Sequence, residues 1–219
     1  MKVKNQKFVM LDLVCYVIFP LAVWHLTREP IGDYYAMLLS SVPGIIYTVY
    51  RFMALKKVNV FGIYILTTLV IGTLLDVLAG SALQLLWNSV IFAYVLAGVF
   101  LVSILIRRPI SLYFALDFTE LQGYNRPFTK RLFYKKKKLT IFNWITVAFA
   151  VQDVLLASIK AWLIIEYGVE AFDKGIILRQ VLNWGIAFLI MGGFFYIGKI
   201  IKEKPELVDE VKEEMGAEK

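Results

Sequence analysis

Six long apolar segments constrain this chain more than any other feature of its sequence. A helix needs roughly 20 mostly apolar residues to cross the hydrocarbon core of a membrane, which is about 30 Å thick. The six segments come close to this length, and we expect spans at about 8–24, 34–50, 60–79, 90–106, 141–165 and 176–200. The sequence therefore predicts an all-α polytopic bundle of six transmembrane helices, which can pair as three helical hairpins.

Composition excludes a soluble fold. Hydrophobic residues make up 59% of the 219 residues and charged residues 19%, whereas soluble domains are about half apolar and about a quarter charged. A soluble chain of this length has too much surface for its volume to hide so many apolar side chains. The lone Cys15 and the lone His25 exclude an internal disulfide and the common zinc and haem-attachment signatures. We expect no metal and no cofactor.

The basic residues predict the orientation of the chain, because Lys and Arg concentrate in cytoplasmic loops. With six spans, the basic clusters at the N-terminus, after the second span, after the fourth and after the sixth all fall on one side. The opposite connection 81–89 carries no charge, and 166–174 is net acidic. Both termini are therefore expected in the cytoplasm. Residues 1–205 form the predicted transmembrane domain, and 206–219 form a short acidic tail.

The segment 107–140 is the long connection between the fourth and fifth predicted spans. Its aromatic residues alternate with basic and acidic ones, which is typical of a segment at the headgroup level of a membrane. Gly123 and Pro127 are expected to break it into two pieces. It either rests on lipid as a connector or docks a partner, and nucleic acid is not an expected partner. The candidate interfacial or partner residues are Arg107, Arg108, Tyr113, Phe114, Asp117 and Phe118.

Four short motifs follow one another along the chain. Leu11-Asp12-Leu13 opens an aromatic-rich first helix, and a basic step at 51–57 follows the second. The fourth helix leaves through the stretch 107–118, and the fifth opens with Asn143-Trp144. Over about residues 8–204 the chain resembles the intracellular septation protein A family and its uncharacterised bacterial relatives. The resemblance implies a multi-pass protein of the bacterial inner membrane, without enzyme activity, that serves cell division and envelope maintenance through other membrane proteins.

Polar residues inside the predicted spans form a second candidate site. A charged side chain at mid-membrane costs roughly 2.5–3.5 kcal/mol on insertion scales, so it needs a partner, a water path or a function. Asp153 and Lys160 share one face of the fifth span but lie about 10 Å apart along its axis, which is too far for a direct pair. We therefore expect partners on other helices. The predicted buried polar cluster consists of Asp76, Gln152, Asp153, Lys160, Arg179 and Asn183.

Three interpretations of this cluster remain open. Buried charge pairs can fix the register of helices with little net stabilisation, or they can line the pathway of a small-solute or ion transporter. A catalytic dyad is the least favoured, because no pattern of nucleophile and base and no phosphate-binding glycine loop is visible. Pro20 in the first span, and Pro43 and Gly44 in the second, predict helix kinks.

The sequence thus favours a non-enzymatic membrane protein that resembles septation protein A and acts through partners. The alternative is a small-solute or ion transporter that uses the buried cluster. A membrane enzyme acting on lipid or isoprenoid comes last, because the chain has no Asp-rich motif for divalent metal. Membrane lipid is an expected contact in each case, and the helix faces are compatible with a monomer and with a homo-oligomer.

Overall fold

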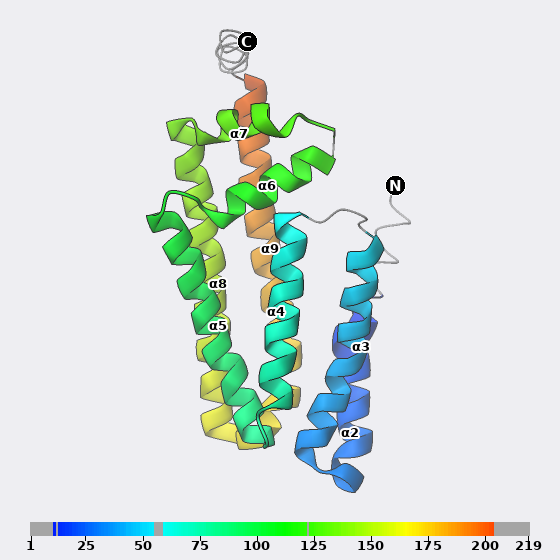
Figure 1. Cartoon of the computed structure of the whole chain (residues 1–219). Coiled ribbons are helices and arrows are strands. Elements are labelled where there is room, and N and C mark those ends of the chain that lie inside the picture. Colours follow the sequence, from blue (N-terminus) through cyan, green and yellow to red (C-terminus); the bar gives the residue numbers. More distant parts are fainter. Residues whose placement is uncertain (1–10, 12, 55–58, 122, 204–219) are drawn as a thin grey trace. The chain divides into compact units, whose positions relative to one another are not determined.

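The computed structural model describes residues 11, 13–54, 59–121 and 123–203, and these form helices joined by short turns, with no strand among them (Figure 1). The predicted acidic tail, residues 206–219, lies outside these residues. The elements are the π-helical turn η1 (Val14–Ile18), α2 (Phe19–Ile31), α3 (Asp33–Ala54), α4 (Val60–Val77), α5 (Ala82–Leu105), α6 (Ile110–Leu121), α7 (Arg126–Tyr134), α8 (Lys136–Tyr167), the 3₁₀ turn η2 (Gly168–Glu170) and α9 (Ala171–Glu203).

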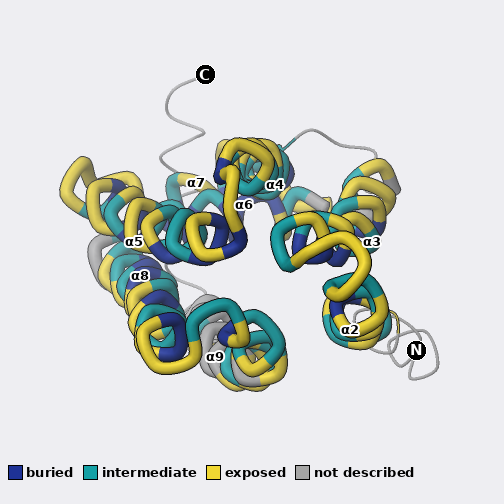
Figure 2. Tube along the Cα trace, turned by 90° about the horizontal axis from the view of Figure 1, so that it is seen from below, coloured by how far each residue is buried: buried dark blue, intermediate teal, exposed yellow. Residues whose placement is uncertain are grey.

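Three helical segments are long and apolar enough to cross a membrane: Val60–Val77 in α4, Ala82–Leu105 in α5, and the stretch 138–185. Only 6% of the apolar window in α4 and 22% of that in α5 are buried inside the protein. Figure 2 shows exposed and half-buried residues over most of both helices. Length, apolarity and uncovered apolar surface together are those of a membrane protein. The count of six spans stays a prediction.

Several helices extend beyond their predicted spans, because local signals set their ends. Helix α5 begins at Ala82 rather than near 90, since Ser81 caps it by accepting a hydrogen bond from the Gln84 N–H at 3.2 Å. A Ser followed three residues later by Gln is the sequence pattern of a capping box. Helix α2 continues past 24 to Ile31 and ends at Gly32, whose φ of 80° suits glycine.

The chain divides into two compact units. The first contains residues 1–58, 62–94 and 155–183, and the second contains 59–61, 95–154 and 184–219. The predicted single transmembrane domain covers both. In the first unit α2 packs against α3.

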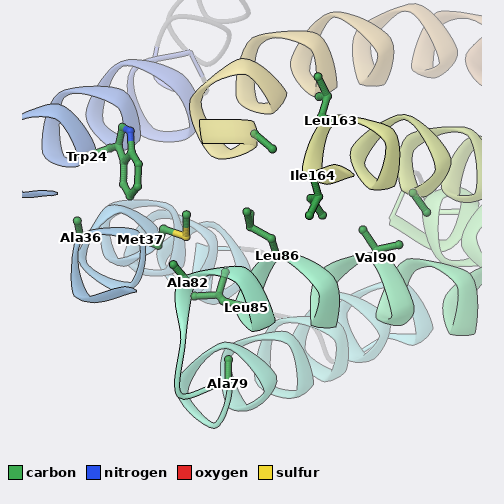
Figure 3. Close-up of a cluster of buried hydrophobic side chains, with 12 residues drawn as sticks. Trp24, Ala36, Met37, Ala79, Ala82, Leu85, Leu86, Val90, Leu163 and Ile164 are labelled. Atoms are coloured by element: carbon green, nitrogen blue, oxygen red, sulfur yellow. The ribbon is translucent and has the colours of Figure 1, made fainter. Parts of the chain in front are cut away.

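The core of the first unit is built from side chains of different sizes (Figure 3). Trp24 and Met37 face Leu86 and Ile164 there, and the Trp24 ring lies 5.0 Å from that of Phe172. Five of its twelve buried residues are alanines, which let helix backbones approach closely. These alanines are Ala36, Ala79, Ala82, Ala157 and Ala171.

The residues predicted to kink the helices have different surroundings. Pro20 lies in the first turn of α2, directly after η1, where the Phe19 N–H bonds to the Val14 carbonyl. Helix α3 runs from Asp33 to Ala54 without interruption through Pro43. A Cβ added to Gly44 would stand 3.3 Å from the Tyr16 ring, so glycine here permits a close approach between η1 and α3.

In the second unit α6 and α7 form a hairpin that runs across the ends of α5 and α8 rather than along them (Figure 1). Its turn contains Gly123 at a φ of 91°, and Pro127 lies in the first turn of α7. The segment thus forms two helices, as the sequence predicts. Their inward side chains make a core with the start of α8, which consists of Leu112, Ala115, Leu116, Phe133, Phe142 and Ile145.

Candidate functional site

The first candidate site lies in the second unit, where α5 ends and the α6–α7 hairpin begins. Helix α5 ends in a Schellman motif: the Arg108 N–H donates to the Ser103 carbonyl and the Arg107 N–H to the Ile104 carbonyl, both at 2.9 Å. This motif places Arg107 at a φ of 56°. Among the described residues, Arg107 is the sole non-glycine residue with positive φ. The left-handed conformation costs an L-residue roughly 1–2 kcal/mol.

Buried hydroxyl groups attach α6 to its neighbours. Ser111 Oγ donates to the Phe142 carbonyl at 2.8 Å and lies 2.7 Å from Thr146 Oγ1. Ser103 Oγ accepts from the Ile110 N–H at 3.3 Å. Because Ser103, Ser111 and Thr146 are all buried, these hydrogen bonds remain shielded from water. They fix the start of α6 against α5 and α8.

An ionic clip joins α6 to α7. Arg126 Nη1 donates to Asp117 Oδ1 at 2.7 Å and to Glu120 Oε2 at 2.5 Å. Asp117 is only 2% exposed, and its second oxygen accepts from the Phe61 N–H at 2.8 Å. The hydrogen bond to Glu120 raises the pKa of Arg126 most, and Asp117 adds to the rise against the opposing effect of desolvation. The clip therefore ties the hairpin together and connects it to the first turn of α4.

Two predicted interfacial residues thus point inward. Asp117 belongs to the clip, and Phe114 is buried with its ring 5.1 Å from that of Phe61. Their surroundings are protein, which differs from the expected contact with lipid or a partner. Phe118, in contrast, is 63% exposed.

A pocket of about 490 Å³ opens between the end of α5 and the α6–α7 hairpin. Tyr113 and Tyr134 stand in its wall with their hydroxyl oxygens 3.1 Å apart. Burial, together with the hydrogen bond to Tyr113, raises the pKa of Tyr134 to about 12, against the opposing charge of Arg108. The Tyr134 phenol therefore stays protonated at neutral pH. The lining residues are Ile106, Arg107, Arg108, Tyr113, Lys130 and Tyr134.

The sequence singled out Arg107, Arg108 and Tyr113 but not Lys130 or Tyr134. The sequence does contain a signal for Lys130 and Tyr134, since both residues lie in the basic, aromatic stretch that forms α7. Their spacing from the arginines gave no reason to choose them, because only the turn between α6 and α7 brings them back to the end of α5.

The second candidate site lies in the first unit and contains part of the predicted polar cluster. Lys160 donates a hydrogen bond to Ser89 Oγ, and it lies within electrostatic range of Asp76 and Arg179. Neither cation makes a direct ion pair with Asp76 in the described part of the chain. Asp76 and Lys160 are half-buried, and Arg179 is exposed. The three charges are thus neighbours without contact.

The other predicted members are distributed over both units. Asn183 is half-buried at the end of the first unit. Gln152 and Asp153 belong to the second unit, and neither side chain is without an interaction partner. The compensation of Lys160 and Arg179 by Asp153 stays a prediction.

Polar contacts near Asp76 satisfy backbone carbonyl groups around the end of α4. Tyr34 Oη donates to the Val77 carbonyl at 2.7 Å, and Asn88 Nδ2 donates to the Leu75 carbonyl at 3.0 Å. Within the described ranges, no three His, Cys, Asp or Glu side chains gather closely enough to hold a metal ion.

No model of a known protein family matches this sequence, and no curated protein and no solved structure is significantly similar to the chain. Its function therefore has to be inferred from the geometry of the two sites.

Proposed function

We propose that the chain is a multi-pass protein of the bacterial inner membrane that performs no chemistry of its own. In this proposal it presents the α6–α7 hairpin to partner proteins and serves cell-envelope maintenance or division, as its resemblance to septation protein A implies. The observation that carries the proposal is the ionic clip of Asp117, Glu120 and Arg126. A connection that only joins two membrane helices needs no buried carboxylate to hold its shape.

The clip and the hydrophobic core beneath it give the hairpin a defined outer surface. Phe118 near the end of α6 is 63% exposed, and Tyr124 in the turn is 61% exposed. Large aromatic side chains on a rigid support lose little conformational freedom on binding, and interfaces are enriched in them. Phe118 and Tyr124 are therefore the proposed contact residues for a partner.

Complementation of a deletion strain tests this role. We expect loss of the gene to cause filamentous cells or sensitivity to detergent, and the wild-type chain to restore the phenotype. The double variant Phe118→Ala/Tyr124→Ala should reach the membrane at normal levels and fail to restore it. The matched control is Phe188→Ala, because Phe188 is 73% exposed on α9 and lies outside the hairpin.

Two results would contradict the proposal. A deletion strain with normal shape and detergent tolerance would remove the envelope role. Full rescue by Phe118→Ala/Tyr124→Ala would exclude the hairpin surface as the binding site for partners.

A second candidate function, transport of a small solute or ion, is favoured by the three neighbouring charges Asp76, Lys160 and Arg179. Ionisable groups within membrane spans mark ion pathways more often than lipid-facing surface. Proteoliposomes loaded with a pH-sensitive dye would report proton-coupled uptake from a panel of ions and solutes. Transport predicts a flux that Lys160→Met abolishes and that Lys174→Gln, in the first turn of α9, leaves unchanged. Equal dye responses in liposomes without the protein and in proteoliposomes would exclude proton-coupled uptake of the tested ions and solutes.

A further inference from the structure

We propose that the pocket between the end of α5 and the α6–α7 hairpin binds an anion that carries a phosphate group. The site is distinct from the aromatic surface proposed for partners, and the inference does not depend on that surface. Three cationic side chains, Arg107, Arg108 and Lys130, and two phenols converge on one cavity. Charge, hydrogen-bonding capacity, backbone conformation and location each support this ligand.

The charge balance of the pocket favours an anion. The segment 107–140 contains only two acidic residues, Asp117 and Glu120, and Arg126 binds both of them. Arg107, Arg108 and Lys130 make no ion pair with an acidic side chain in the part of the chain that the structure describes. Their mutual repulsion is relieved when a negative group enters between them.

The hydrogen-bonding groups suit phosphate oxygens. A guanidinium group offers a planar fork of donors that matches phosphate, and a lysine adds a point charge. The hydroxyl groups of Tyr113 and Tyr134 lie 3.1 Å apart, so one donates to the other and the second keeps its hydrogen for a ligand. The pocket, at about 490 Å³, falls in the range of small-molecule sites. It holds far more than one water, whose share of liquid volume is about 30 Å³.

The backbone at Arg107 is a separate indication. The left-handed position of a Schellman motif is normally filled by glycine, yet an arginine occupies it here at a φ of 56°. Residues kept in sparsely populated conformations cluster at functional sites, where the strain has a purpose. A side chain that lines the pocket is such a purpose, because glycine would relieve the strain and remove the guanidinium group.

Location suggests where the phosphate comes from. Ile106, Arg107 and Arg108 directly follow α5, one of the helices long and apolar enough to cross a membrane. Basic side chains at the end of such a helix reach the level of lipid phosphates. A lipid headgroup and a free phosphate share the chemistry that the pocket recognises, and the experiment separates them.

Native mass spectrometry of the full chain in detergent tests the inference with three probes. These are phosphatidic acid, a diacylglycerol with the same acyl chains but no phosphate, and inorganic phosphate. We expect phosphatidic acid to bind and diacylglycerol not to. Displacement of phosphatidic acid by millimolar inorganic phosphate would identify a site for soluble phosphate, and resistance to it would identify a lipid site.

The variants Arg107→Gly and Lys130→Gln should each weaken binding by about tenfold or more, since each removes a charge-assisted hydrogen bond. Arg107→Gly should unfold at a temperature no lower than wild type, because glycine tolerates the left-handed turn. Lys174→Gln removes one positive charge in the first turn of α9, outside the pocket, and serves as the control. Equal binding of phosphatidic acid and diacylglycerol would overturn the proposal. So would binding by Arg107→Gly and Lys130→Gln that matches the control.

Discussion

Replacement of Asp117 by Asn isolates the contribution of the ionic clip to stability. One carboxylate oxygen of Asp117 binds Arg126, and the other accepts from the Phe61 N–H. Asparagine has a single acceptor oxygen, so it can satisfy one of these donors and must turn its NH₂ group toward the other. The variant therefore loses one of the two hydrogen bonds of the buried carboxylate and leaves its donor without an acceptor at this position.

The expected loss of stability follows from burial. A hydrogen bond to a charged group contributes about 1.5–3 kcal/mol, and Asp117, at 2% exposure, has little access to compensating water. For a chain of this size, each kcal/mol lowers the melting temperature by about 2–4 °C. We therefore expect Asp117→Asn to unfold about 3–12 °C below wild type, as followed by tryptophan fluorescence in detergent.

Glu120→Gln is the matched control, because Glu120 lies on the same helix and binds the same Arg126 nitrogen. Its side chain is 38% exposed, and solvent-exposed ion pairs contribute about 0.2–1 kcal/mol. The control should lower the melting temperature by less than about 4 °C. If Asp117→Asn destabilises the chain no more than Glu120→Gln does, burial of Asp117 does not determine the strength of the clip.

Three further predictions concern topology, pH and helix capping. In a Cys15→Ala background, Tyr124→Cys should react with a membrane-impermeant maleimide only after the cytoplasmic face is opened, and Lys174→Cys should react in intact cells; the reverse pattern would refute the predicted orientation. The pKa of Tyr134, raised from 10.0 to about 12, means that its phenol stabilises the fold below about pH 10 and that this contribution disappears as pH rises toward 12. Tyr134→Phe should therefore lose less melting temperature than wild type between pH 10 and 12, and parallel pH curves would contradict this. Ser81→Ala removes the cap of α5 and should lower the free energy of unfolding by about 1 kcal/mol, measured by thermal unfolding against wild type; an unchanged value would mean that the cap does not hold this end.

Local sequence signals predicted the helical class and the two-piece connector. Gly123 marks the turn between α6 and α7 because a φ of 91° suits glycine. The sequence also contains a signal for the start of α5, since Ser81 and Gln84 have the spacing of a capping box. The expected start near residue 90 is wrong because the uncharged segment 81–89 belongs to the capped start of α5 and is not a loop. Apolarity alone does not fix where a membrane helix begins.

Long-range contacts account for what the sequence did not predict. Asp117 binds the Phe61 N–H across 56 residues of chain, and no periodicity relates these positions. Asp117 and Phe118 are adjacent in the same amphipathic pattern, yet one is buried and the other is 63% exposed. The direction in which α6 faces its core separates them, and only the packing of α6 on α8 sets that direction.

The basic residues of the connector illustrate why a count of charges cannot identify a site. The positive-inside rule treats every Lys and Arg alike and predicts a side of the membrane from their sum. Arg126 forms ion pairs with two carboxylates within the hairpin. Arg107 and Lys130 line a pocket instead, and no described acidic side chain binds them there. The net charge that orients the chain is the same in both cases. Capacity to bind an external anion depends on which cations the fold leaves without an internal partner, and in this protein the position of Asp117 and Glu120 on one helix decides it.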